Sequence, residues 1–149
     1  MYSESDELVA KRFAMAVKHG ITPLFCIGET LQERESGVME DVVSRQLDAV
    51  IDSQGIDAIG QCVIAYEPVW AIGTGVTASP EQAQAVHAFI RNKLAALSED
   101  VAAKVQILYG GSMNAANAAE LLSQTDIDGG LIGGAALKAD DFLAIGKSA

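Results

Sequence analysis

The hydrophobic positions of this chain follow two patterns: short apolar runs and longer stretches with helical spacing. Val9, Phe13 and Val17 lie four residues apart, which places them on one face of a helix. The pattern stops at Gly20, a residue type that commonly ends helices. We therefore expect a helix over residues 6–19.

Four short, mainly apolar runs have the composition of buried strands. They cover residues 21–27, 62–66, 105–109 and 127–132. Glycine or glutamate follows each run directly, and such a change of residue type is typical of a strand end. We expect four strands at these places.

Helical patterns follow the first two runs. Thr30 with Glu33, and later Ser79 with Gln82, have the spacing of capping boxes at helix N-termini. The first helix is expected to end before Gly55. The apolar residues predicted to form the buried faces of the two helices are Val43, Leu47, Val50 and Ile51, then Val86, Phe89, Ile90, Leu94 and Leu97.

The regular alternation of strand and helix predicts an α/β fold. A short helix over residues 116–122 and a last helix from about residue 140 follow the third and fourth runs. Parallel neighbours need such crossovers and are buried on both faces. A doubly wound sheet and part of a barrel both fit this order, and both bind ligands at the carboxyl ends of the strands. No linker divides the series, so residues 1–149 are expected to form one domain.

Composition and charge narrow the classes of partner. Half of the 149 residues are hydrophobic and the formal net charge is −10, so the chain has enough apolar material for a core. No apolar run is long enough to cross a bilayer, and the N-terminus is polar, so we expect a cytoplasmic protein without signal peptide or membrane span. The acidic balance disfavours nucleic acid and anionic membranes as partners.

The two cysteines are predicted to be structural. Cys26 and Cys62 both lie within apolar runs, and neither has metal-ligand spacing to another Cys or His. We therefore interpret both as buried, reduced thiols and expect no metal site and no cofactor.

Glu67 is the first candidate for chemistry. It ends a predicted strand and precedes Pro68, which favours an extended backbone at Glu67 and fixes the position of its carboxylate. A partly buried carboxylate there would have a raised pKa and could act as a general base near neutral pH. The alternative is an ordinary carboxylate that caps a neighbouring backbone N–H.

The loop after Glu67 is apolar and rich in glycine, which is unusual for a solvated connection. We interpret it as a lid that would exclude water from a reaction centre, with a glycine N–H close to an anion. The alternative is a packed loop anchored by its tryptophan. The loop consists of Trp70, Ala71, Ile72, Gly73, Thr74 and Gly75.

Two glycine pairs follow the last two predicted strands. Gly110 and Gly111 precede Ser112, and Gly133 is followed by Gly134. Glycine lets backbone N–H groups approach an oxyanion, and a following helix adds its positive end. Together the pairs predict a phosphate site of the kind that barrel enzymes build after their last two strands. Each pair alone also fits a tight strand-to-helix turn.

These motifs together resemble the triosephosphate isomerase family. AYEPVWAIGTG (65–75) is similar, residue for residue, to the family's active-site segment, and CIGE (26–29), YGGS (109–112) and LIGGAAL (131–137) follow in the family's order and spacing. The resemblance extends from end to end of the chain. It implies half of a (β/α)₈ barrel, truncated at the N-terminus, with the fourth helix followed by strands five to eight.

The resemblance also implies a role for each motif. Glu67 is similar to the base that moves a proton between adjacent carbons of dihydroxyacetone phosphate and glyceraldehyde 3-phosphate. The positions similar to the family's phosphate contacts are Gly73, Ser112, Gly133 and Gly134. Those similar to its lid and latch are Pro68, Val69 and Trp70 in the first hinge, Ala71, Ile72, Thr74 and Gly75 in the lid, Tyr109 and Ser112 in the latch, and Glu29 as partner of Trp70.

The family's catalytic lysine and electrophilic histidine precede the region that this chain resembles, so we expect the chain to lack both. His19 at a helix end and His87 within a helix are expected to be structural or exposed, not substitutes. Loss of one preorganised donor typically costs about 10² to 10³ in rate. The chain alone should therefore show almost no turnover, and its open sheet edges should favour aggregation.

Three functional interpretations follow. The first is a triosephosphate isomerase that needs a complementary N-terminal half or a homo-oligomer to complete its site. The second is a non-catalytic half-barrel that binds phosphate or closes a barrel by pairing with itself. The third, another phosphosugar enzyme, is disfavoured because residues 65–75 match one family so closely.

Overall fold

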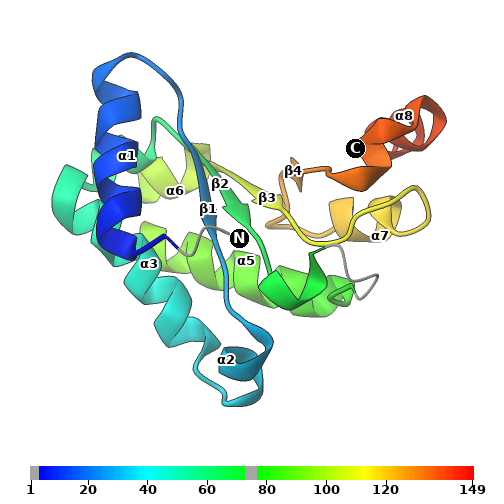
Figure 1. Ribbon diagram of the computed structural model, residues 1–149, viewed down its shortest axis with the longest axis horizontal. Coiled ribbons are helices and arrows are strands. Elements are labelled where there is room, and N and C mark those ends of the chain that lie inside the picture. The colour runs from blue at the N-terminus through cyan, green and yellow to red at the C-terminus, as the bar shows by residue number, and fades with distance from the viewer. Residues whose placement is uncertain (1–3, 73–76) are drawn as a thin grey trace.

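A four-stranded parallel sheet forms the centre of the protein (Figure 1). The computed structural model describes residues 4–72 and 77–149. Within them the strands occur in chain order across one sheet, with every pair parallel, and β1 and β4 form the two edges. The strands are β1 (Leu24–Ile27), β2 (Val63–Tyr66), β3 (Gln106–Tyr109) and β4 (Gly129–Gly130). The prediction of four parallel strands, each followed by helix, is confirmed, and the open sheet fits part of a barrel.

The register of the sheet brings the four strand ends together. Ile27 pairs with Tyr66, Tyr66 with Tyr109, and Tyr109 with Gly130. Because the strands are parallel, the residues that follow these four positions lie along one edge of the sheet. The motifs singled out in the sequence are therefore neighbours in space.

The helical segment after β1 consists of two helices instead of one. Thr30 and Glu33 form both bonds of a capping box at the start of α2 (Leu31–Glu35), as predicted. Gly37 then adopts a φ of +73°, which a helix cannot accommodate. The apolar stripe lies on the separate helix α3 (Met39–Gln54), whose residues Val43, Leu47 and Val50 are fully buried.

The helix after β2, α5 (Pro80–Ala95), begins at the predicted capping box of Ser79 and Gln82. Val86, Ile90 and Leu94 are buried on it as predicted. Leu97 is not: it lies beyond the helix end and is 55% exposed. The prediction extended the helical period past the point where the helix stops.

The remaining helices are short except for α1, which matches its predicted range closely. They are α1 (Asp6–Lys18), α4 (Ile56–Ile59), α6 (Glu99–Lys104), α7 (Ala118–Leu122) and α8 (Ala139–Gly146), with 3₁₀ turns η1 (Val69–Ala71) and η2 (Gly134–Leu137). The sequence pattern did not predict α4 and α6, because four to six residues are too few to establish a helical period.

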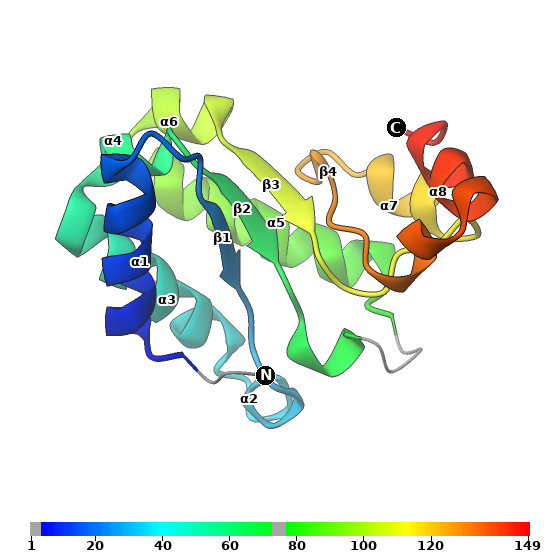
Figure 2. The same ribbon diagram turned by 45° about the horizontal axis from the view of Figure 1, so that its top comes forward.

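The core lies between the sheet and the layer of long helices. Helix α1 packs on α3 and α3 on α5, and α5 passes behind β2 and β3 in Figure 2. On β1, Phe25 and Ile27 are buried toward this layer, whereas Leu24 and Cys26 are exposed on the other face. The prediction of a buried thiol is therefore wrong for Cys26, because among the described residues no layer covers this face of the edge strand. It is confirmed for Cys62.

Candidate active site

Glu67 follows β2 directly at the carboxyl edge of the sheet. Its backbone N–H donates to the Ile27 carbonyl oxygen at 2.7 Å, which ties the residue to the neighbouring strand. Pro68 comes next in an extended conformation. Burial raises the pKa of the Glu67 carboxyl group, and interaction with the Cys26 thiol opposes part of that rise. The side chain therefore has the half-buried position and the direction of pKa shift expected for a general base.

Cys26 is a site residue that sequence reasoning missed. Its thiol and the carboxyl group of Glu67 shift each other's pKa, while the hydrogen bond of the thiol goes to the Leu24 carbonyl oxygen at 4.0 Å. Desolvation, followed by the negative charge of Glu67, raises the pKa of the Cys26 thiol to about 11. The thiol is therefore protonated at neutral pH and serves as a donor. The proximity of the two side chains depends on the parallel register, which pairs Cys26 with Ala65, so no local sequence signal reveals it.

Two glycines make room for Glu67. A Cβ added to Gly28 would lie 1.9 Å from the Glu67 carbonyl oxygen, and one added to Gly110 would lie 2.5 Å from its Cγ. Both distances are far below van der Waals contact, so no side chain fits at either position. Gly110, interpreted from the sequence as part of a phosphate cradle, thus has a packing role beside the candidate base.

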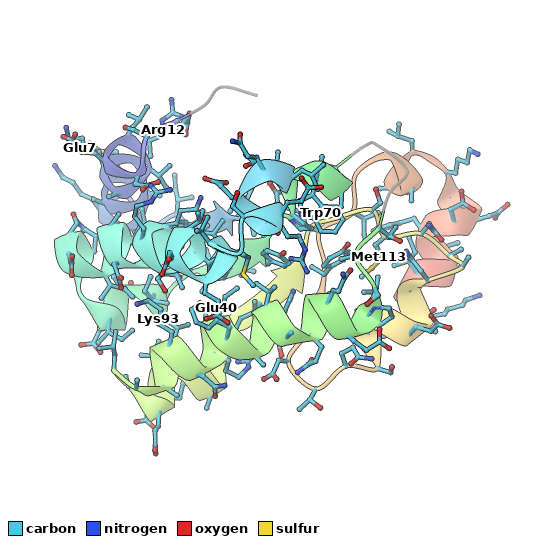
Figure 3. The ribbon with its side chains drawn as sticks, turned by 90° about the horizontal axis from the view of Figure 1, so that it is seen from below. Glu7, Arg12, Glu40, Trp70, Lys93 and Met113 are labelled. Atoms are coloured by element: carbon cyan, nitrogen blue, oxygen red, sulfur yellow. The ribbon has the colours of Figure 1, made fainter. Side chains whose placement is uncertain are left out.

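Glu29 is completely buried and binds three donors with one oxygen. Its Oε1 accepts hydrogen bonds from Trp70 Nε1 at 2.9 Å, Tyr66 Oη at 3.1 Å and Arg34 Nη1 at 3.1 Å. The Arg34 guanidinium also lies 5.2 Å from the centre of a Trp70 ring, within the range of a cation–π contact. Figure 3 shows Trp70 on η1, beside α2. The family resemblance implied that Glu29 is the partner of Trp70, and the structure brings the two together.

The segment that begins at Pro68 is bonded to β3 and its following loop at two described points. The Ala71 carbonyl oxygen accepts hydrogen bonds from Ser112 N at 3.1 Å and Ser112 Oγ at 2.6 Å. The Tyr109 hydroxyl accepts a hydrogen bond from Ala78 N at 3.2 Å. Tyr109 and Ser112, predicted as a latch, thus contact both described ends of the loop.

Three of the four predicted phosphate positions, Ser112, Gly133 and Gly134, lie within the described residues. Gly133 and Gly134 lie after β4 at the start of η2, and a Cβ at either would meet no atom within 4 Å. Their backbone therefore borders open space. Ile72 ends the described part of the loop, and the predicted site residues Gly73, Thr74 and Gly75 lie outside the described residues.

The two histidines are structural or exposed, as predicted. His19 is exposed at the C-terminal cap of α1, and His87 is completely buried within α5. In the described part of the chain, no group of three or more His, Cys, Asp or Glu side chains could hold a metal ion. No helix of residues 4–72 and 77–149 has the length and hydropathy needed to cross a membrane.

The fold and the site together define an α/β protein with a candidate general base at the carboxyl edge of a parallel sheet. The chain belongs to the triosephosphate isomerase family, because the model of that family matches residues 1–149. It is 64% identical over 149 residues to the triosephosphate isomerase of Thiobacillus denitrificans, with 100% of this chain and 60% of the relative covered.

Two further relatives agree. The triosephosphate isomerase of Pseudomonas entomophila is 64% identical over 146 residues, which cover 98% of this chain and 58% of the relative. That of Hydrogenovibrio crunogenus is 61% identical over 149 residues, which cover 100% and 59%. The chain thus spans about 60% of the length of the curated relatives it matches.

Proposed function

We propose that this chain supplies the base-bearing part of a triosephosphate isomerase, which interconverts dihydroxyacetone phosphate and glyceraldehyde 3-phosphate. The observation that carries the proposal is Glu67: a half-buried carboxylate with a raised pKa, fixed at the carboxyl end of β2 in a segment typical of this family. A cytoplasmic location accords with this activity.

In the proposed reaction, the Glu67 carboxylate removes a proton from the carbon beside the carbonyl group. An enediolate forms, and the protonated carboxyl group returns the proton to the adjacent carbon, while the proton of the neighbouring hydroxyl group passes to the former carbonyl oxygen. The raised pKa makes Glu67 a stronger base than an exposed glutamate. Interaction with the Cys26 thiol opposes part of this rise in the pKa of Glu67.

The other predicted residues would bind and enclose the substrate. We assign phosphate contacts to Gly73, Ser112, Gly133 and Gly134, and assign the lid and its first hinge to Pro68, Val69, Trp70, Ala71, Ile72, Thr74 and Gly75. Glu29, Tyr109 and Ser112 would determine the lid's position. Their bonds to Trp70, Ala78 and Ala71 support this assignment.

This chain alone would turn over very slowly, since the family's lysine and electrophilic histidine have no counterpart in the motifs it carries. We propose a complementary N-terminal half as partner, bound at the open edge of β1. A groove of about 440 Å³ beside that edge supports this proposal. Its apolar lining includes Val9 and Phe13 of α1 and Leu24 and Phe25 of β1.

Complementation tests the proposal. The chain would be co-expressed with the part of the Thiobacillus denitrificans relative that it does not match, and isomerisation would be assayed. We expect the complex to convert either triose phosphate and the isolated chain to be almost inactive. Glu67→Gln should lower the rate of the complex by about 10² to 10⁴, the usual contribution of a positioned base. A well-folded complex without activity would contradict the proposal.

A second candidate function is a non-catalytic half-barrel that closes by self-association. Two unpaired sheet edges, β1 and β4, favour it, because parallel edges of two copies could pair around a two-fold axis. Native mass spectrometry tests it directly. A folded monomer at all accessible concentrations would exclude self-closure.

A further inference from the structure

His87 lies beneath the last residues of two neighbouring strands. Its imidazole packs edge-on against Tyr66 of β2, with ring centres 5.7 Å apart and planes at 86°. It also lies 6.4 Å from the ring centre of Tyr109 of β3, at 39°. Tyr66 and Tyr109 are register partners, so one buried side chain of α5 contacts both ring systems.

One hydrogen bond and deep burial hold the His87 ring in place and keep it uncharged. The Asp126 carbonyl oxygen lies 3.1 Å from Nδ1, and a carbonyl oxygen only accepts, so Nδ1 carries the proton. Nε2 has no hydrogen-bond partner among the described residues. Burial lowers the pKa of His87 to about 4, which keeps the ring uncharged at neutral pH.

The two tyrosine hydroxyls are connected to opposite ends of the loop that follows Glu67, that of Tyr66 through Glu29 and that of Tyr109 directly. Tyr66 Oη donates to Glu29 Oε1 at 3.1 Å, and the same oxygen accepts from Trp70 Nε1 at 2.9 Å. Tyr109 Oη accepts from Ala78 N at 3.2 Å. The two rings that His87 contacts therefore carry the hydroxyl groups that lie in these bonding paths to Trp70 and Ala78.

We propose that His87 is a positioning residue whose ring couples Trp70 to Ala78 through Tyr66 and Tyr109. A shift of the ring would displace both tyrosines, since core side chains are closely packed. The inference rests on the proposed function only for its consequence in catalysis, namely that both ends of the loop are positioned together. The coupling itself is a property of this chain.

Two substitutions separate the ring from its hydrogen bond. His87→Asn keeps an N–H that can donate to the Asp126 carbonyl but removes the ring. His87→Phe keeps a ring of similar shape but removes the donor. Trp70 fluorescence reports one end of the loop, because Trp70 is the only tryptophan in the sequence. Amide hydrogen exchange at Ala78, followed by NMR, reports the other.

We expect His87→Asn to shift the Trp70 emission and to accelerate exchange at Ala78 by at least about tenfold through local opening. In His87→Phe, the Trp70 emission and the exchange rate at Ala78 should both stay close to their values in the unmodified chain. Denaturant unfolding should show that this variant is less stable, because it lacks the hydrogen bond to Asp126. If His87→Asn does not fold, His87→Gln, which fills more of the ring's volume, replaces it. Tyr66→Phe and Tyr109→Phe are the controls: the first should change Trp70 alone and the second Ala78 alone.

Three results would overturn the inference. The first is a change at only one of the two reporters, or at neither, in His87→Asn or in the His87→Gln variant that replaces it. The second is a disturbance as large in His87→Phe as in the amide variant. The third is exchange at Ala78 that follows global unfolding in every variant. No substrate is used, so failure of the complementation assay leaves these readings unaffected.

Discussion

At the scale of single residues, the carboxyl group of Glu67 and the thiol of Cys26 shift each other's pKa. Burial raises the pKa of Glu67, and interaction with the Cys26 thiol opposes part of that rise. The negative charge of Glu67 in turn disfavours a thiolate. At neutral pH the Cys26 thiol is therefore protonated.

Cys26 should react slowly with iodoacetamide although it is exposed. The thiolate is the reactive form, and a rise of the pKa from 9.0 to about 11 lowers its population at pH 8 by about a hundredfold. We expect alkylation about a hundredfold slower than for a model cysteine peptide, measured by mass spectrometry. Glu67→Gln should accelerate it. Cys62, buried and with a pKa of about 12, is the control and should react only after unfolding. A rate equal to that of the peptide would contradict this account.

Glu67→Gln should stabilise the chain at neutral pH. The folded-state pKa of Glu67 is raised above its usual value, so the stability linked to its protonated form is present at about pH 4 and is lost as the pH rises through the folded pKa. Glutamine does not titrate, so its advantage over glutamate should grow as the pH rises from about 4 through the folded-state pKa of Glu67.

Denaturant unfolding at several pH values measures this effect. Glu7→Gln is the matched control, because a hydrogen bond from Lys11 lowers the pKa of Glu7 and the difference should have the opposite sign. A stability difference for Glu67→Gln that did not depend on pH would show that burial does not control this carboxyl group.

The sequence predicted the place of Glu67 but not its surroundings. Pro68 and the end of an apolar run identify a fixed carboxylate at a strand end from local rules alone. The contact with Cys26 depends on the register between β1 and β2, which follows from the packing of the whole sheet and not from local pattern. For the same reason Cys26 was assigned to the core, although the face it occupies is open.

At the scale of elements, the capping box at Ser79 determines where α5 begins, and thereby where His87 lies. Ser79 Oγ accepts from Gln82 N at 3.2 Å, and Gln82 Oε1 accepts from Ser79 N at 3.0 Å. Both bonds satisfy N–H groups that the first helical turn leaves unpaired.

Ser79→Ala should lower the free energy of unfolding by about 1 kcal/mol, the typical cost of losing an N-cap acceptor. Ser79→Asp retains an acceptor at the same position and should change the stability little. Urea unfolding of both variants, followed by circular dichroism, measures the difference. Equal losses in the two variants would mean that the cap does not stabilise α5.

Helices and strands that are marked by a local sequence pattern could be predicted, and those without one could not. Both capping boxes were found because their residues have a fixed spacing. The break between α2 and α3 was missed, since a single glycine within a polar stretch, here Gly37, is a weak signal until its positive φ is known. The strand predicted over residues 127–132 shrinks to Gly129–Gly130, because glycine contributes no side chain to hold an edge strand against the core.

At the scale of the whole molecule, the sheet has two exposed edges and one incompletely covered face. Leu24 of β1 is 46% exposed, and the groove beside it has an apolar lining. An edge strand with an exposed apolar residue offers unpaired backbone groups to any second chain. The net charge of −10 opposes association but is screened by salt.

We therefore expect the isolated chain to associate through the β1 edge, and Leu24→Lys to weaken this association by at least about tenfold, because lysine on an edge strand blocks strand addition. Leu143→Lys is the matched control: Leu143 is 57% exposed but lies on α8, away from β1, as Figure 1 shows. Sedimentation velocity over a range of concentrations measures both variants. Equal effects would mean that reduced hydrophobicity in general, and not the open edge, controls association. A loss of complementation by Leu24→Lys alone would place the partner at the same edge.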